Sequence, residues 1–208
     1  MNIIEKYDPY FVFTGVLVNL FIALQFLAVW VSPRWDQATQ IETLAVLMGF
    51  EFIMVHSGVF MAVFPKKFSL FIFFPVYGLF AVAFALMIDD WHIIAFTYLF
   101  AIFNRMRFAF ADVPQHIKSR NMLTSILAVV IYFFLVMFVA FAADLIPTFG
   151  LTDAYLNASG YKENLDAGGL FLDEPQTAIC LGVLYYGVLA LVEFYLVRRN
   201  QKLTTSKS

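Results

Sequence analysis

The sequence predicts an all-α, polytopic membrane protein with six transmembrane helices in one bundle and both termini on the cytoplasmic side. Three observations support this prediction. Hydrophobic residues make up 62% of the chain and charged residues 13%, whereas soluble globular proteins have about half apolar and about a quarter charged residues. Six apolar segments are each long enough to cross a bilayer, which takes about 20 residues. The basic residues fall almost entirely on one side of these segments.

Prolines and charged residues separate the six apolar segments, as is typical of helix ends. The predicted spans cover residues 10–31, 43–64, 68–88, 91–111, 122–146 and 177–197. All connections except one are short, so the whole chain, residues 1–208, is expected to form a single membrane domain. It ends in a polar cytoplasmic tail, residues 198–208.

The distribution of lysine and arginine predicts the orientation. Only Arg34 and Lys162 fall on the outer side of a six-span arrangement. The basic residues on the other side are Lys6, Lys66, Lys67, Arg105, Arg107, Lys118, Arg120, Arg198, Arg199, Lys202 and Lys207. Because lysine and arginine accumulate in cytoplasmic loops, both termini are predicted to be cytoplasmic, in a multi-pass protein of the cell (inner) membrane. Residues 1–8 do not resemble a secretory signal peptide, so the first span is expected to remain in the mature protein.

The one long connection, residues 148–176, is predicted to lie outside and is acidic. Its charged residues are Asp153, Lys162, Glu163, Asp166, Asp173 and Glu174. Three glycines favour a mobile or irregular loop, although residues 151–156 are compatible with a short interfacial helix. Such a loop would cover the outer mouth of the bundle.

Glu51 and His56 are the strongest functional candidates because they lie inside the apolar run of residues 43–64. An acid and an imidazole are costly to keep within a bilayer, so they mark sites for protons, ions or small polar molecules. The structural alternative for Glu51 is a protonated, paired or hydrated carboxyl group that only stabilises the bundle. For His56 it is a hydrogen bond to a backbone carbonyl or to Asn104.

The helical rise of about 1.5 Å per residue predicts the depth of each polar side chain. Glu51 falls about 13 Å from the outer face, and Asn19 is expected close to the same level. A second level, nearer the cytoplasm, is expected to hold His56, Asn104, Arg105 and Glu193. Together these six residues form the predicted substrate or ion pathway. The alternatives are that Arg105 snorkels to the interface and that Glu193 pairs with a nearby arginine only for stability.

No metal or cofactor is predicted. Asp89, Asp90 and His92 crowd the outer end of the third and fourth spans as weak cation candidates, but aspartates at a helix start also cap free N–H groups without any metal. The single cysteine, Cys180, excludes an intrachain disulfide and a multi-cysteine metal site. Its apolar surroundings indicate a small buried residue.

No catalytic residue is predicted, because serine-hydrolase, zinc-protease, P-loop and dinucleotide-binding motifs are absent. The first interpretation is a transporter- or channel-like role for a proton, a cation or a small polar solute. The second is a non-catalytic membrane subunit or assembly factor, and the third is an intramembrane enzyme or a quinone- or lipid-binding protein that uses Glu51 and His56. The expected partners are the lipid bilayer and a second copy of the chain or a membrane partner subunit, and no nucleic acid.

Overall fold

The computed structural model describes residues 3–86, 92, 99, 115–163, 165 and 168–205, and every regular element among them is helical. Four long helices dominate: α1 (Ile3–Val31), α2 (Ala38–Val63), α6 (Gln115–Phe141) and α9 (Pro175–Thr205). The shorter elements are α3 (Lys66–Phe68), the π-helix η1 (Ser69–Phe73), α4 (Phe74–Ala85), the 3-10 helix η2 (Ala143–Leu145), α7 (Asp153–Ala158) and α8 (Leu170–Asp173). The predicted all-α class is confirmed for the described residues.

Four of these helices are long and apolar enough to cross a membrane. The candidate spans are Tyr7–Val31, Ala38–Ser57, Ile117–Phe141 and Pro175–Leu196. They correspond to the first, second, fifth and sixth spans predicted from the sequence. By length and composition, the described residues therefore form a helical membrane protein with four candidate spans, where the sequence predicts six.

The third predicted span, residues 68–88, differs from a regular transmembrane helix. Its apolar helical stretch, Phe71–Ala83, is shorter than the four candidate spans. The π-helix η1 directly precedes α4, in which Pro75 is the second residue. Proline lacks a backbone N–H and its ring clashes with the preceding turn, so the widened hydrogen-bonding pattern of a π-helix is physically reasonable here. The fourth predicted span, residues 91–111, lies outside the described residues apart from His92 and Leu99.

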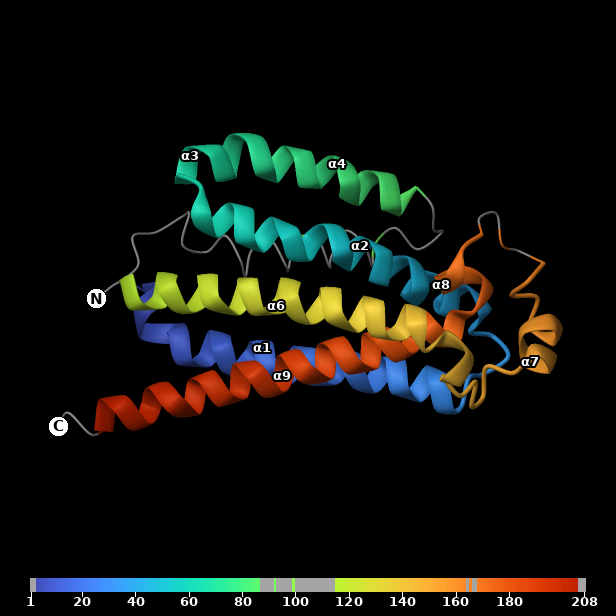
Figure 1. Ribbon diagram of the computed structural model, residues 1–208. Coiled ribbons are helices and arrows are strands. Elements are labelled where there is room, and N and C mark those ends of the chain that lie inside the picture. Colours follow the sequence, from blue (N-terminus) through green and yellow to red (C-terminus); the bar gives the residue numbers. More distant parts are fainter. Residues whose placement is uncertain are drawn as a thin grey trace.

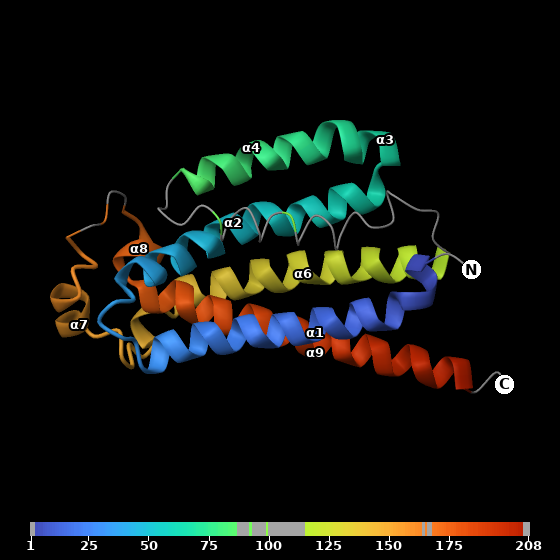
Figure 2. The ribbon, with the colours of Figure 1, turned by 180° about the vertical axis from the view of Figure 1, so that it is seen from behind.

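The four long helices run alongside one another as a bundle (Figure 1). The most extensive contact joins α1 to α9, while α2 lies against α6 and α9. Gly182 of α9 permits the close approach of α1, since a Cβ atom at this position would lie 2.3 Å from Cδ1 of Phe26. Helix α4 packs on the outer side of α2, as the view from behind also shows (Figure 2).

The two ends of the bundle differ. Both termini lie at one end, which we call the terminal end, and α7 and α8 lie at the other, which we call the loop end (Figure 1). Helices α1 and α6 begin at the terminal end, and α2 and α9 begin at the loop end. The chain directions therefore alternate between these helices.

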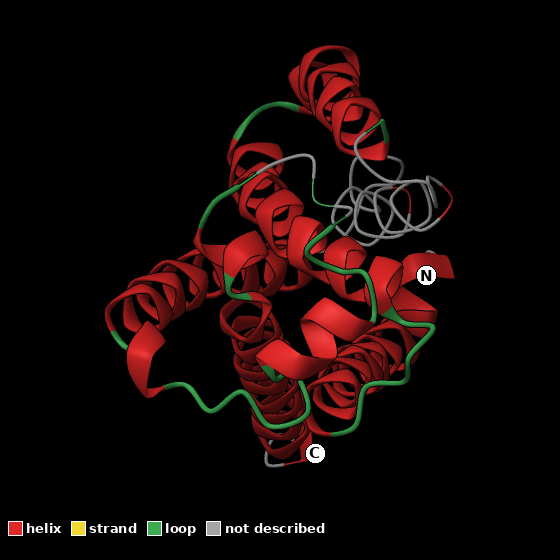
Figure 3. Ribbon diagram, turned by 90° about the vertical axis from the view of Figure 1, so that its right-hand side faces the viewer, coloured by secondary structure: helices red, strands yellow, loops and turns green. Residues whose placement is uncertain are grey.

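The long connection after α6 is held against the loop end by specific contacts. Tyr155 of α7 donates a hydrogen bond to the carbonyl oxygen of Arg34 at 2.6 Å, and Nε1 of Trp30 donates to the carbonyl oxygen of Pro147 at 2.9 Å. The Thr152 side chain caps α7 by accepting from the Tyr155 N–H. Figure 3, seen from the loop end, shows the connecting segments crossing this end of the helices. The short helix considered for residues 151–156 is present, two residues further along the chain.

Two buried tyrosines contribute hydroxyl donors to this region. Tyr161 donates to the carbonyl oxygen of Leu172 at 2.9 Å, which ties the segment after α7 to α8. Burial raises the pKa of both Tyr155 and Tyr161 above the ordinary tyrosine value. Both hydroxyls therefore stay protonated, as hydrogen-bond donation requires.

Candidate intramembrane polar site

Glu51 lies within α2 with its side chain buried in the bundle. It is 5% exposed, and its Oε1 accepts a hydrogen bond from the hydroxyl of Tyr185 in α9 at 2.9 Å. Tyr185 itself is fully buried. A buried acceptor without a donor would cost about 1–3 kcal/mol, so this bond offsets part of the cost of placing a carboxyl group here. It also connects α2 to α9.

Helix α6 contributes a second tyrosine to the same place. The ring of Tyr132 packs edge-on against Tyr185 with the centroids 5.2 Å apart. Its hydroxyl donates to the carbonyl oxygen of Met48 at 2.5 Å. Met48 precedes Glu51 by three residues, so the two tyrosines bond to adjacent turns of α2. Glu51, Tyr132 and Tyr185 thus join three helices, and we call them the Glu51 cluster.

A second polar contact lies between α1 and α9. The amide Nδ2 of Asn19 donates to Oε2 of Glu193 at 3.2 Å. Gly15 leaves room for this carboxyl group, since a Cβ atom at Gly15 would lie 3.0 Å from the same oxygen. We call this the Asn19–Glu193 site. Tyr185 and Glu193 are eight residues apart in α9, about 12 Å along the axis, so the site is separate from the Glu51 cluster.

This pairing corrects the predicted depth of Asn19. The sequence places Asn19 level with Glu51, but the structure pairs it with Glu193, which is predicted at the more cytoplasmic level. At the terminal end α1 begins at Ile3 and α9 continues to Thr205, beyond the spans predicted from hydropathy. Counting residues from those span ends therefore misplaces Asn19, because packing between the helices sets their relative offset.

The described contacts of His56 are within its own helix. Its Nδ1 lies 2.6 Å from the carbonyl oxygen of Phe52, and its ring packs against the Phe52 ring with the centroids 4.7 Å apart. Because a carbonyl oxygen can only accept, this geometry requires the proton on Nδ1. The backbone hydrogen bond is the structural alternative considered for His56.

Some of the predicted site residues fall in the part of the chain that the structure does not describe. Asn104 and Arg105, from the predicted pathway, lie outside the described residues, as do Asp89 and Asp90. His92 is described and exposed. Within the described part of the chain, no three histidine, cysteine, aspartate or glutamate side chains are grouped so that they could hold a metal ion. Cys180 is buried in the apolar core, as its sequence context indicates.

Sequence reasoning missed an ion pair at the terminal end. Nη2 of Arg120 in α6 lies 2.7 Å from Oδ1 of Asp8 in α1, and both side chains are largely buried. The sequence gives only a weak indication of this pair. Asp8 and Arg120 have opposite charges and lie close to the ends of two predicted spans, on the same predicted side of the membrane. Tyr132 and Tyr185 were also missed. Both tyrosines lie inside a predicted span, whereas interfacial tyrosines lie at span ends. That position is the feature of the sequence that could have identified them.

Comparison of the chain with protein-family models, with curated proteins and with solved structures gives no match. The function is therefore inferred from the geometry of the polar groups.

Proposed function

We propose that this chain is a six-span protein of the cell (inner) membrane, with cytoplasmic termini and a transporter- or channel-like role for protons, cations or small polar solutes. Glu51 is the proposed proton- or cation-binding group. The observation that carries the proposal is a carboxyl group that is 5% exposed and hydrogen-bonded to Tyr185 between apolar helices.

The directions of the described helices support the topology. Helix α4 ends at the loop end and α6 begins at the terminal end (Figures 1 and 2). One further crossing between them, as the sequence predicts for residues 91–111, would complete six spans. Lys118 lies near the start of α6 at the terminal end, whereas Arg34 and Lys162 lie at the loop end. This distribution favours a cytoplasmic terminal end.

The chemistry of Glu51 supports a reversible binding site. An ionised carboxylate inside a membrane is costly unless it binds a proton, a cation or a hydrogen-bond donor. Tyr185 donates to Oε1. A carboxylate accepts at both oxygens, and a carboxylic acid protonated at Oε2 still accepts at Oε1. Glu51 can therefore take up and release a proton without losing this hydrogen bond.

The test is ion flux through purified protein in sealed liposomes, read with a pH-sensitive dye for protons and with sodium- and potassium-sensitive dyes for the two cations. Gradients of protons, sodium and potassium are imposed in turn. Glu51→Gln should lower the flux of the conducted ion at least about tenfold, which corresponds to about 1.4 kcal/mol in the barrier. The control is Glu163→Gln, an exposed acid of the outer loop, which should conduct like the native chain. Equal flux through native and Glu51→Gln protein would contradict the proposal.

A non-catalytic membrane subunit is the second candidate, and one observation favours it. The Glu51 cluster is closed, with Tyr185 fully buried and Tyr132 nearly so, and it connects three helices by side-chain hydrogen bonds. Such bonds also serve simply as interhelical contacts in membranes. Co-purification from native membranes distinguishes the two candidates. A stoichiometric partner, together with no flux through the isolated chain, would support the subunit.

A further inference from the structure

We propose that one face of α1, centred on Gln25, binds a second copy of the chain within the membrane. The two copies are related by a twofold axis along the membrane normal, and their Gln25 amides hydrogen-bond to each other across the interface. This inference goes beyond the proposed function, because it concerns the outer surface of α1 and not the buried Glu51 cluster.

The position of Gln25 along α1 places its amide inside the hydrocarbon of the bilayer. The candidate span Tyr7–Val31 has 25 residues, and Gln25 lies six residues from its middle, about 9 Å along the axis. The hydrocarbon core extends about 15 Å to each side of the bilayer centre. Trp30, a residue type that marks the interface, lies five residues further along α1. Gln25 is thus in the half of the bundle nearer the loop end, which we call the loop half.

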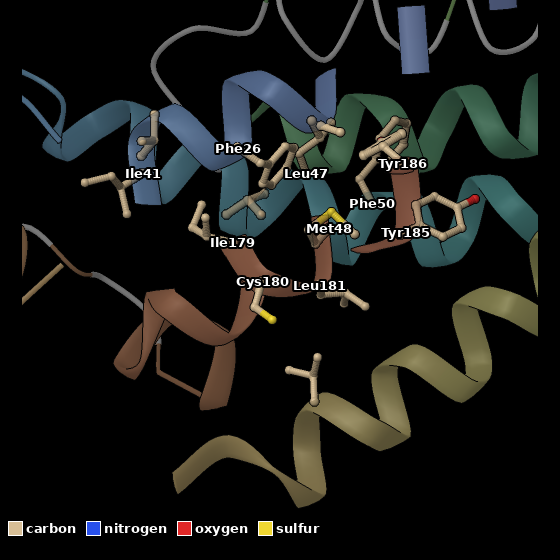
Figure 4. Packing of buried hydrophobic residues seen from close by; sticks show 14 of the residues in the cluster. Phe26, Ile41, Leu47, Met48, Phe50, Ile179, Cys180, Leu181, Tyr185 and Tyr186 are labelled. Atoms are coloured by element: carbon tan, nitrogen blue, oxygen red, sulfur yellow. The ribbon is translucent and has the colours of Figure 1, made fainter. Parts of the chain in front are cut away.

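The packing of the next residue turns Gln25 away from the core. Phe26 is fully buried, and its ring lies 5.9 Å from that of Tyr186 in α9, as the close view of the core shows (Figure 4). Successive residues of an α-helix point about 100° apart. The Gln25 side chain is accordingly exposed, and within the described part of the chain no hydrogen-bond partner contacts it.

An exposed amide at this depth is unfavourable in a single chain. Its Nε2 has two protons to donate and its Oε1 accepts, whereas lipid tails offer neither donors nor acceptors. The nearer interface is at the loop end, but Cα–Cβ bonds tilt toward the N-terminus of a helix. For α1 that direction leads to the terminal end and therefore toward the middle of the bilayer. The amide is best satisfied by a partner with a polar group at the same depth.

A second copy of the chain meets this requirement by symmetry. Two copies with the same orientation in the membrane have their Gln25 side chains at the same depth. Each Nε2 can then donate to the Oε1 of the other copy, as a self-complementary twofold interface demands. A different protein would need its own amide, hydroxyl or acid at this one level. The self-complementary chemistry of the amide therefore favours the second copy.

The residues that flank Gln25 suit helix pairing. They occur in two series with a spacing of seven, offset by three and four residues, which is the pattern of a left-handed helix pair. Every face of α1 is apolar, so this spacing alone selects no face, whereas the single amide does, and it also sets the register of the pair. Thr14 and Ala28 are small enough to let the two backbones approach closely. The first series is Phe11, Val18 and Gln25, and the second is Tyr7, Thr14, Phe21 and Ala28.

The rest of the bundle leaves this face accessible. Among the described helices, only α9 packs extensively against α1. Figures 1 and 2 place these two helices on the side of the bundle opposite α4. Thr14, Phe21 and Ala28 are exposed, and Val18 is half-buried. A second copy can therefore contact α1 without displacing any described helix.

Energy transfer between copies in liposomes tests the role of the amide. Glu163→Cys, at an exposed position of the loop, carries the donor or acceptor dye in a Cys180→Ala background, and the protein-to-lipid ratio is varied. Gln25→Leu should raise the dissociation constant of the dimer about tenfold, because two interhelical hydrogen bonds are lost. Gln25→Asn retains a self-complementary amide and should stay within about threefold of the native value. Leu20→Ala changes an exposed residue about 140° around the helix and is the control.

Disulfide cross-linking tests the face itself. Thr14→Cys and Ala28→Cys, each in the Cys180→Ala background, should form linked dimers under mild oxidation, because their Cβ atoms approach those of the second copy. Leu20→Cys should link at least about tenfold more slowly, since its Cβ points away from the interface. Two positions on the proposed face keep the test valid if one variant fails to fold.

Three results would overturn the inference. The first is a native chain that is monomeric at every protein-to-lipid ratio, which would leave Gln25 to lipid or to a different subunit. The second is equal dimerisation of native and Gln25→Leu protein, and the third is linking of Leu20→Cys as fast as both Thr14→Cys and Ala28→Cys. Neither experiment depends on conduction, so unchanged flux in Glu51→Gln would remove the proposed function and leave this interface intact.

Discussion

Two ion pairs of equal length lie at opposite ends of the bundle in very different surroundings. Asp8–Arg120 joins α1 to α6 at the terminal end and Lys162–Asp153 lies beside α7 at the loop end, each at 2.7 Å. The Asp8 and Asp153 side chains are 9% and 86% exposed. A hydrogen bond from Lys162, reinforced by its charge, lowers the pKa of Asp153. That exposed pair is therefore lost only as the pH falls through a value below the ordinary aspartate pKa.

The comparison shows that burial, rather than distance, decides what an ion pair contributes. At the terminal end, opposite charges are held inside the helix bundle. At the loop end, the covering segment is held by aromatic and backbone contacts. Phe149 packs edge-on against Trp30 with the centroids 5.0 Å apart, and the Gly150 N–H donates to the Trp30 carbonyl oxygen. Phe149 has φ of 46°, a left-handed conformation that is unfavourable for a bulky residue and is maintained by these contacts.

The largest expected effect is at the terminal end. Asp8→Asn should lower the free energy of unfolding by about 3 kcal/mol, because it leaves the buried Arg120 guanidinium without its carboxylate. Thermal unfolding in detergent micelles measures the loss. The matched control is Asp153→Asn, which removes the carboxylate of the exposed pair and should leave the melting temperature unchanged. Equal changes in melting temperature in the two variants would show that the buried and the exposed ion pair contribute equally to stability.

A smaller effect is expected in the apolar loop half. Gly182→Ala should destabilise the protein by about 1–3 kcal/mol, because the new methyl group meets the Phe26 ring and separates α1 from α9. Gly187→Ala is the matched control in the same helix, since a Cβ atom there meets nothing within 4 Å. It should leave the stability unchanged or raise it slightly, as alanine favours helix. Both variants are compared by melting temperature; equal destabilisation would contradict the proposed role of this contact.

The smallest effect concerns the covering segment. Tyr155→Phe removes the hydrogen bond to the Arg34 carbonyl oxygen but retains the ring contact with Trp35, so it should cost about 1 kcal/mol. Hydrogen exchange of α7 should become faster while exchange in α1 and α9 stays unchanged. Tyr195→Phe, at an exposed position of α9, is the control and should alter neither. Unchanged exchange in α7 would show that this hydrogen bond does not hold the segment.

Hydropathy predicted the long spans well because their signal is local. Residues 10–31, 43–64, 122–146 and 177–197 each correspond to a candidate span, with ends that shift by several residues. The third span was predicted as an apolar helix over residues 68–88 in which Pro75 and Gly78 favour a kink, and the structure has a π-helix before Pro75. Hydropathy averages over such details, since a π-turn changes the backbone hydrogen bonds without changing the composition.

The sequence singled out several residues of the candidate site but not the contacts that they make. Glu51, Asn19 and Glu193 stood out because polar groups are costly in apolar spans. The cost of burying a polar group does not, however, indicate which residue will be its hydrogen-bond partner. Tyr185 and Tyr132 are common aromatic residues of membrane helices, and only the structure shows their hydroxyls bonded to Glu51 and to the Met48 carbonyl oxygen.

The sequence by itself predicted a helical chain with apolar spans and costly polar groups within them, and four of its six predicted spans correspond to helices long and apolar enough to cross a membrane. Those properties follow from composition and from the need of every backbone group in a bilayer to be satisfied within its own helix. Only the tertiary structure decided which polar groups meet. The offset and rotation of each helix depend on side-chain packing, such as Phe26 on Gly182, and that packing pairs Asn19 with Glu193 and Glu51 with Tyr185.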